Sequence, residues 1–352
     1  LELGRTYKKE GSLEKAIEKF RQVIEIEPDI TDAYYELGKA YINKGRVDKA
    51  ILEFQKVLKR DGKNVEVKFE LGKAYKSQGM YDEAQKSFAE VVEANFEHAL
   101  AHIELGLIYS SLYQTDKAIS EFEISISLEP ENSNVLFELG KLYFEKYQFE
   151  KAVEHFKKAL AIDGNNPIVI YKLGEVYFNL KQYENAIKEY QKVLKLQPDF
   201  VDAIHKLGTV YALTEKYNEA ITQLSKAAEY DNESPAIFSE LAEAYEKIGD
   251  FEKSMLNYEK ALALKPDMIN IIYKLGSKYK EKRLYYKMVD LYQNAIKYAP
   301  SNALFYYELG DSLRNRDMFN EAKAQYRRAL ELNPEFVDAM FGLMEISFAQ
   351  GE

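Results

Sequence analysis

Histidine is the residue type whose spacing could support metal chemistry in this sequence. His98 and His102 are four residues apart, so on a helix both imidazoles would lie on one face and could bind a single ion. His102 also lies three residues before Leu105, a spacing typical of core packing, which favours a structural role for its ring. We therefore predict no metal site.

Other catalytic chemistry has little support in the residue types. The chain has no cysteine, which removes thiol nucleophiles, thiolate metal ligands and disulfides. It also lacks a glycine-rich phosphate loop and a serine nucleophile elbow. We predict that the protein is not an enzyme and that it has no catalytic residues and no cofactor.

The charge balance restricts the class of partner. A formal net charge of −10 repels phosphate backbones and anionic lipid, so we expect neither nucleic acid nor a membrane surface as a partner. No apolar stretch approaches the ~18 residues of a membrane span, so membrane insertion is not expected. The cytoplasm and the bacterial periplasm both stay open, and the abundance of Lys, Glu, Ile, Tyr and Asn is typical of a bacterial protein.

A repeat with a period of 34 residues runs through the whole sequence. Leu3, Gly4 and Tyr7 return as Leu37, Gly38 and Tyr41. The anchor leucine then recurs in perfect register at Leu71, Leu105, Leu139, Leu173, Leu207, Leu241, Leu275, Leu309 and Leu343. A fixed period of this length indicates stacked structural units.

Each unit has the apolar spacing of two amphipathic helices. Tyr34, Leu37 and Tyr41 fall on one face of a first helix, and Ala50 and Phe54 on one face of a second. The recurring glycine costs about 1 kcal/mol in a helix, which indicates that a neighbouring helix approaches it closely. Small residues recur in the second helix at Ala16, Ala50, Ala84, Ala118, Ala152, Ala186, Ala220 and Ala322.

Prolines and glycines mark the boundaries of these helices. All the prolines fall between helices, with Pro167 and Pro235 at helix starts and Ser234 as an N-cap. The other prolines, at unit corners, are Pro28, Pro130, Pro198, Pro266, Pro300 and Pro334. Gly11, Gly45, Gly79 and Gly249 indicate left-handed turns between the two helices of a unit.

The pattern Leu-Gly-x-x-Tyr, Ala-x-x-x-aromatic and corner Pro resembles the tetratricopeptide repeat (TPR) family. The resemblance implies an all-α fold, a right-handed α-solenoid of tandem helix-turn-helix units with first helices lining a concave groove. Residues 1–352 would form one continuous array of about ten repeats, with the first truncated and the last only one helix. We expect a fragment of a longer protein, with locally different packing at Ala242, Met288 and Met344.

In this family, first-helix side chains commonly hold the partner. The residues two before each anchor leucine are mostly aromatic, so they could form a binding ladder, although packing between hairpins is the more common role of rings at this position. The residues two after each anchor leucine are basic early in the chain and acidic late, which suggests a groove with a basic N-terminal half and an acidic C-terminal half. The predicted partner-binding set is Arg5, Tyr35, Lys39, Phe69, Lys73, Lys76, Phe137, Lys141, Tyr171, Tyr273, Tyr307 and Asp311.

Local ion pairs are the alternative explanation of these charges. Glu36 with Lys39, Glu70 with Lys73 and Glu138 with Lys141 have the i,i+3 spacing of helix pairs. Two like-charged pairs remain, and we expect Lys247 to relieve Glu240 with Glu243, and Arg314 to relieve Glu308 with Asp311.

The function that the resemblance implies is a scaffold that binds partner proteins or peptides, most directly in the concave groove. Two alternatives stay open. The array could self-associate by stacking through uncapped ends, or it could be the regulatory or targeting arm of a larger enzyme or secretion complex.

Overall fold

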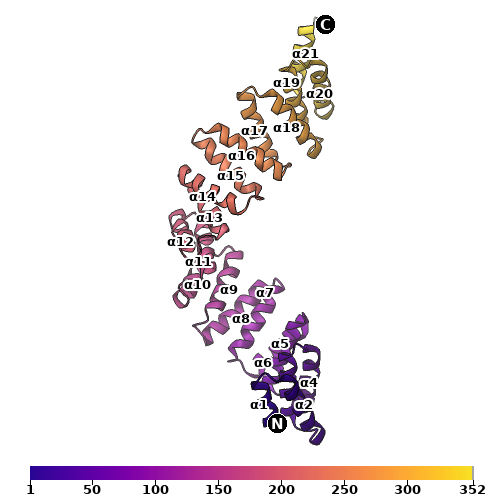
Figure 1. The fold of residues 1–352 in the computed structure, drawn as a ribbon, viewed down its shortest axis with the longest axis vertical. Coiled ribbons are helices and arrows are strands. Elements are labelled where there is room, and N and C mark those ends of the chain that lie inside the picture. The colour runs from indigo at the N-terminus through magenta and orange to yellow at the C-terminus, as the bar shows by residue number, and fades with distance from the viewer. Residues whose placement is uncertain (351–352) are drawn as a thin grey trace. The chain divides into compact units, whose positions relative to one another are not determined.

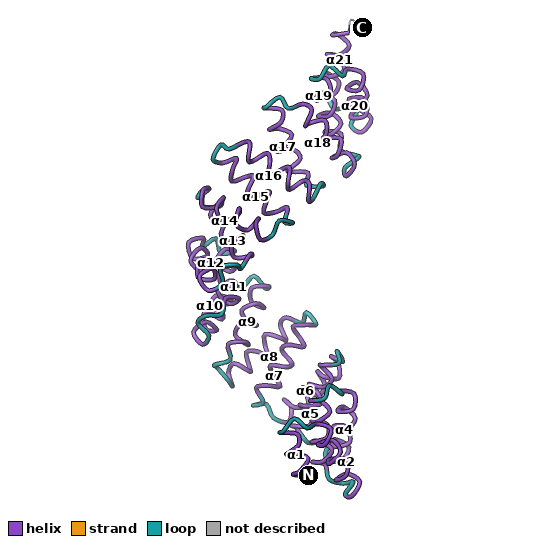
Figure 2. Tube along the Cα trace, viewed as in Figure 1, coloured by secondary structure: helices purple, strands orange, loops and turns teal. Residues whose placement is uncertain are grey.

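The computed structural model describes residues 1–350, all of whose regular structure is helical (Figures 1 and 2). The chain divides into two compact units, Leu1–Val176 (unit 1) and Tyr177–Glu352 (unit 2). The helices are α1 Glu2–Lys9, α2 Leu13–Ile26, α3 Thr31–Asn43, α4 Val47–Arg60, α5 Val65–Ser77, α6 Tyr81–Ala94, α7 Ala99–Ser111, α8 Thr115–Leu128, α9 Ser133–Glu145, α10 Phe149–Ile162, α11 Pro167–Asn179, α12 Tyr183–Leu196, α13 Val201–Leu213, α14 Tyr217–Tyr230, α15 Pro235–Lys247, α16 Phe251–Leu264, α17 Ile269–Glu281, α18 Tyr285–Tyr298, α19 Ala303–Arg314, α20 Phe319–Leu332 and α21 Val337–Gln350.

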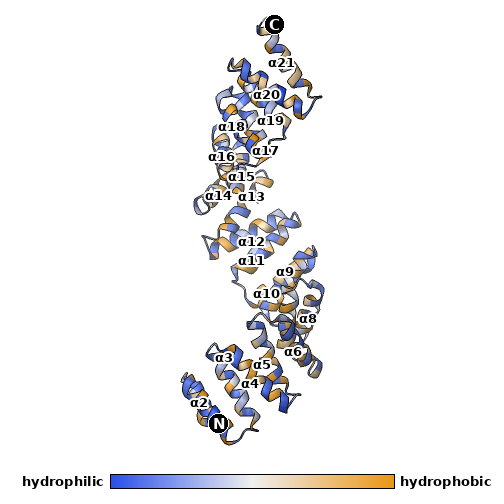
Figure 3. Cartoon of the chain, turned by 90° about the vertical axis from the view of Figure 1, so that its right-hand side faces the viewer, coloured by the Kyte–Doolittle hydropathy of each residue, from blue (hydrophilic) through white to orange (hydrophobic). Residues whose placement is uncertain are grey.

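Odd-numbered helices are the first helices of the hairpins, and even-numbered helices are the second. This alternation confirms the predicted helix-turn-helix units and the all-α repeat fold. Pro167 and Pro235 are the first residues of α11 and α15, as predicted, because a first-turn residue needs no amide donor. Figure 3 shows hydrophobic and hydrophilic residues interleaved along the helices, as amphipathic packing requires. The prediction of one continuous array stays a prediction.

The core of most hairpins is built from a glycine, an alanine and a large ring. In the α3–α4 hairpin, Ala50 and Phe54 are fully buried, and a Cβ on Gly38 would lie 2.5 Å from Cε1 of Phe54. The absent Cβ therefore lets the second helix place its ring directly against the first helix. This confirms the close approach that the recurring glycine indicates.

A recurring hydrogen bond joins neighbouring hairpins. The hydroxyl of an anchor-motif tyrosine meets a side chain 20 residues earlier, on the preceding second helix: Gln55 Nε2 donates to Tyr75 Oη over 2.9 Å. Gln191 and Tyr211 repeat the bond over 3.0 Å, and Tyr143 donates to Glu123 in the same register. Burial and the bonded carboxylate raise the pKa of the Tyr143 hydroxyl.

Helix starts differ in how they are capped. Asn64 accepts a hydrogen bond from the Val67 amide, and Asp250 accepts one from Lys253. Ser234 lies at the predicted N-cap of α15, but its side chain makes no capping bond. The cap prediction is therefore right in position and wrong in mechanism, since Pro235 at the next position fixes the backbone without it.

The turn inside each hairpin uses a left-handed residue at a fixed position of the repeat. The predicted glycines have positive φ, between 72° at Gly45 and 83° at Gly249. Non-glycine residues take the same conformation at Tyr113, Tyr147, Lys181, Glu215, Arg283 and Asp317. A side chain in this region costs roughly 1–2 kcal/mol, so these turns are less stable than the glycine turns.

Arg283→Gly is accordingly expected to stabilise the protein by about 1 kcal/mol, because φ at this position is 55°. The midpoint of urea unfolding should rise. Lys282→Gly is the matched control: its φ is −86°, so the same change should lower the midpoint through added backbone freedom in the unfolded chain. Equal shifts of the two midpoints would contradict the prediction.

Candidate functional site

One surface of the first helices is formed by the residues five before, two before and two after each anchor leucine. We call it the first-helix face. These positions are spaced i, i+3 and i+7, so they make one stripe along each helix. In unit 1 the stripe on α7 consists of Leu100, Ile103 and Leu107, and this is the only first helix with aliphatic residues at all three positions.

An apolar cavity opens beside the α7 stripe. It has a volume of about 560 Å³ and is lined by the three α7 residues, by Phe137 of α9 and by Ile168 at the start of α11. Leu100 is 51% exposed and Ile168 is 54% exposed. Aliphatic side chains left this open to solvent next to a cavity provide a place for an apolar group of another molecule.

The rim of this cavity is polar and includes the carboxylates of Glu138 and Asp163. The Lys141 ammonium pairs with Glu138 over 2.7 Å and lies 5.2 Å from the centroid of the Phe137 ring. Asn132 and Asn166 line the rim, and each accepts a hydrogen bond from a backbone amide at the start of α9 or α11. The exposed Asn134 side chain completes the rim.

The predicted aromatic ladder is only partly accessible. Phe69 and Tyr171 are buried, at 9% and 8% exposure, which corrects the expectation that their rings are presented to a partner. Phe69 packs against Phe88 of the second helix with ring centroids 5.5 Å apart. Packing between hairpins, the alternative weighed for these rings, accounts for both positions.

The remaining predicted rings are half-buried. Tyr35 donates to Glu66, and burial together with that carboxylate raises the pKa of its hydroxyl. Tyr273 accepts a hydrogen bond from Asn302 over 2.9 Å. Tyr307 packs against Phe336 with centroids 5.1 Å apart, and burial raises the pKa of its hydroxyl. Each of these rings is therefore partly exposed and partly occupied by contacts within its own unit.

Most of the predicted charges are paired, and one pairing differs from the expectation. Lys73 pairs with Glu70 over 2.8 Å as predicted, and Lys76 reaches Glu104 of the next hairpin over 2.6 Å. Glu36 does not pair with Lys39, whose ammonium lies 4.9 Å from the Tyr35 ring centroid.

Glu36 pairs instead with two cations of the preceding hairpin, Lys8 and Arg5. Burial opposes ionisation of Glu36, but the bonds from these two cations outweigh it and hold its pKa below the usual range. Arg5 Nε is 3.0 Å from Glu36 Oε1, so this predicted site residue is part of an internal contact.

In unit 2 the like-charged pairs are relieved in two different ways. Arg314 bonds Asp311 over 2.6 Å, as predicted, and Lys280 lies 3.0 Å from the same carboxylate, which is 4% exposed. The expected role of Lys247 is wrong. Glu243 pairs with Lys274, and Glu240 accepts a hydrogen bond from Thr209 over 2.6 Å.

The two histidines with metal-compatible spacing have other partners. His102 is 2% exposed, with Nδ1 2.6 Å from Glu121 and Nε2 2.9 Å from the Phe96 carbonyl, so its predicted structural role is confirmed. His98 Nδ1 accepts a bond from the Ala101 amide. Residues 1–350 contain no cluster of three or more side chains suited to a metal ion.

No helix in the part of the chain that the structure describes is long and apolar enough to cross a membrane. On α21, apolar side chains including Phe341 and Phe348 are exposed, at 56% and 89%. Self-association of the array stays a prediction.

Sequence reasoning missed Leu100, Leu107 and Ile168 as candidate site residues. The prediction rested on the position two before each anchor leucine, which carries mostly aromatic rings. Many of these rings pack between hairpins. The signal available was the i, i+3, i+7 aliphatic stripe of α7, at positions where the other first helices carry at least one polar or charged residue.

Comparison with known proteins places these repeats in a family. A TPR repeat model matches residues 4–45, 140–181, 174–214 and 210–249. Tetratricopeptide repeat models match residues 44–103, 99–132, 236–268 and 303–336. The matched segments leave out 269–302, the hairpin that contains Met288. No curated protein matches the chain.

Solved structures show the same fold. The C-terminal part of a TPR repeat-containing protein from Cytophaga hutchinsonii is 18% identical, with 78% of this chain and 99% of that chain covered and a TM-score of 0.52. A tetratricopeptide repeat protein from Parabacteroides merdae is 16% identical, with 70% and 98% covered and a TM-score of 0.50.

YrrB, described as a TPR protein with an unusual peptide-binding site, is 24% identical, with 53% of this chain and 96% of that chain covered and a TM-score of 0.49. The family matches are to an interaction repeat and span most of both units. The chain therefore belongs to the tetratricopeptide repeat family, and it is a scaffold of the protein-interaction class.

Proposed function

We propose that the protein binds a polypeptide segment of a partner on the first-helix face of unit 1, with the cavity beside α7 as the anchor site. The observation that carries the proposal is the aliphatic stripe Leu100, Ile103 and Leu107 next to a cavity of about 560 Å³. An anchor group that enters this cavity removes half-exposed aliphatic surface from water.

The chemistry of the cavity favours an uncharged apolar anchor. Burying a leucine-sized side chain stabilises a complex by about 1.5–3 kcal/mol, whereas a charge placed among the aliphatic side chains would lose its hydration. Lys141 and Glu138 already neutralise each other. The asparagine side chains at the rim are suited to hydrogen bonding with the backbone of a bound segment.

Ile103→Glu tests this proposal. Peptides selected for binding to the full chain from a displayed random library should bind the variant at least about tenfold more weakly, as expected for an anchor contact worth ~1.4 kcal/mol. Fluorescence anisotropy measures the Kd, and circular dichroism checks that the helices are retained. The matched control is Ile162→Glu, since Ile162 is 44% exposed on α10 and does not line the cavity.

Binding unchanged in Ile103→Glu, or weakened equally by Ile162→Glu, would sink the assignment of the α7 cavity. Lys39→Glu and Lys73→Glu provide a second arm of the test. These lysines lie over aromatic rings of the same face, so loss of binding in this arm alone would move the site toward α3 and α5.

A further inference from the structure

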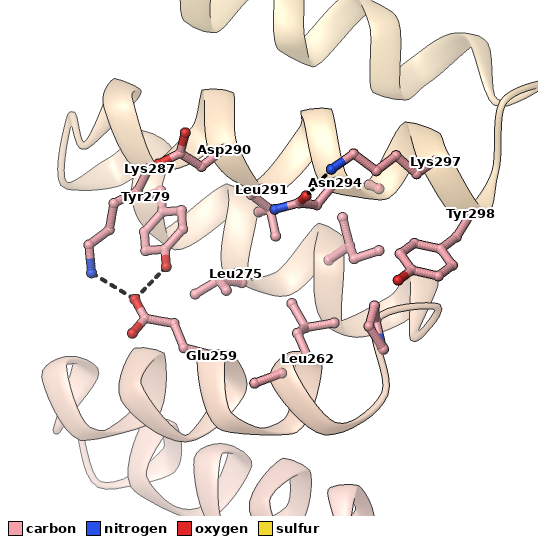
Figure 4. Close-up of a pocket in the computed structure, with 14 residues that line it drawn as sticks. Glu259, Leu262, Leu275, Tyr279, Lys287, Asp290, Leu291, Asn294, Lys297 and Tyr298 are labelled. Atoms are coloured by element: carbon pink, nitrogen blue, oxygen red, sulfur yellow. Dashed lines mark hydrogen bonds and ion pairs between the residues drawn. The ribbon is translucent and has the colours of Figure 1, made fainter.

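A second groove lies in unit 2, on the side formed by the second helices of its hairpins. It lies between α16 and α18 with α17 as its floor, and it has a volume of about 540 Å³ (Figure 4). Leu262, Leu275 and Leu291, one from each helix, give it an apolar lining. It is distinct from the first-helix face, because α16 and α18 are both second helices.

One substitution in the repeat distinguishes the hairpin that borders this groove. Met288 occupies the position that is alanine in most other second helices, and it is fully buried between α17 and α18. Tyr292, the residue type that Tyr258 and Tyr326 also provide at this position, places its hydroxyl directly against Gly276. Ser254 and Ala322 are the small residues at this position in the neighbouring hairpins, and the larger Met288 side chain separates α18 from α17, whose backbones approach less closely than those of α15–α16 or α19–α20.

This hairpin is also the one that the family models leave unmatched, residues 269–302. Its departure from the repeat is therefore visible in the sequence as well as in the packing. The sequence prediction of locally different packing at Met288 is confirmed, and the groove lies against this hairpin.

One end of the groove is closed by polar side chains. Glu259 of α16 accepts hydrogen bonds from Tyr279 of α17 and, over 2.7 Å, from Lys287 of α18 (Figure 4). This cluster joins the three helices and satisfies the carboxylate. The apolar lining is therefore held open by a fixed structure, as a binding groove requires.

Two charges of opposite sign lie along the α18 edge of the groove. Asp290 is exposed and has no ion pair within residues 1–350. Lys297 is also exposed and donates to Asn294 over 2.8 Å, with no carboxylate partner in the same range. They are seven residues apart, so about 10 Å of helix axis separates them.

We propose that this groove binds a short amphipathic helix of a partner protein, which carries a basic residue opposite Asp290 and an acidic residue seven positions away opposite Lys297. A helix lying alongside α18 matches the spacing of these charges turn for turn. Its apolar residues at i, i+4 and i+7, on the face turned toward the groove, contact Leu262, Leu275 and Leu291. The proposal does not depend on the α7 cavity.

The probe is a library of 18-residue helical peptides with apolar residues fixed at i, i+4 and i+7 and the flanking positions randomised, selected on the full chain. Selected peptides are expected to carry a basic and an acidic residue seven positions apart. Leu291→Asp should weaken their binding at least about tenfold, while Leu256→Asp, on the exposed surface of α16 outside the groove, should leave it unchanged.

Charge reversal makes the test specific. Asp290→Lys should weaken binding roughly fivefold at low salt, and a peptide with its basic residue changed to glutamate should restore binding to this variant. Glu252→Lys, an exposed carboxylate of α16 outside the groove, is the control.

The proposal is overturned if no peptide is selected, if selected peptides lack the charge pattern, or if the reciprocal reversal restores nothing. Peptides whose binding is lost in Ile103→Glu instead of Leu291→Asp also overturn it, and that outcome would support the first-helix site alone.

Discussion

Gly140→Ala is expected to destabilise the α9–α10 hairpin by about 3 kcal/mol. A Cβ at this position would lie 2.5 Å from Cε1 and 2.6 Å from Cδ1 of Phe156, a ring that is 1% exposed. The ring cannot move aside freely, because it also contacts Phe137 at a centroid distance of 5.8 Å. The added methyl group must separate the two helices or force the ring off its rotamer.

Gly164→Ala is the matched control in the same unit. The nearest atom to its Cβ would be a carbonyl oxygen at 3.6 Å, so the substitution should change the midpoint of urea unfolding only slightly. The cost at Gly140 is limited, because one hairpin accommodates alanine at the equivalent position of the repeat. In α15–α16 this residue is Ala242, and it and Tyr258 are both fully buried. Equal midpoints for the two variants would show that helix contact is not the reason for the recurring glycine.

The sequence was sufficient to predict the repeat because each unit solves the same packing problem locally. Leu37, Gly38 and Ala50 reflect contacts within one hairpin, so their spacing repeats wherever the hairpin does. The left-handed turns show where this reasoning ends. Glycine predicted four of them, whereas Tyr113 and Tyr147 adopt the same φ because the hairpin imposes it on whatever residue is present.

Side-chain partners were harder to predict because they depend on distances between hairpins. Glu36 has Lys39 at the ideal helical spacing but pairs with Lys8, 28 residues earlier in the chain. Stacking brings the two hairpins together, and the sequence spacing within a helix contains no information about that contact. The α16–α18 groove has the same origin, since Met288 identifies a disturbed hairpin without showing which helices separate.

Asp311→Asn is expected to destabilise the protein by about 2 kcal/mol. Asp311 is 4% exposed, and its carboxylate bonds both Lys280 and Arg314. Asparagine would leave these two cations facing an uncharged amide. The effect is smaller than for a fully buried pair, because the side chains of Lys280 and Arg314 are 45% and 31% exposed. Thermal unfolding followed by circular dichroism at pH 7 measures the change.

Glu308→Gln should have the opposite sign although it lies three residues away. Burial raises the pKa of Glu308, with Asp311 raising it further and Lys280 opposing the shift. A raised pKa in the folded state means that the protonated form is the one stabilised by folding, so the stability contribution is greatest in acid and is lost as the pH rises through the raised value. At pH 7 the ionised side chain is therefore a cost that glutamine removes.

The difference between wild type and Glu308→Gln is thus expected to be largest at neutral pH, to shrink as the pH falls through the raised pKa of Glu308, and to be absent below the ordinary pKa of a glutamate. Urea unfolding of both proteins between pH 4 and pH 8 measures it. A stabilisation that did not change with pH would mean that shape, and not ionisation, decides the effect at this position. Opposite signs at Glu308 and Asp311 would show that the two carboxylates differ because only Asp311 is matched by two bonded cations.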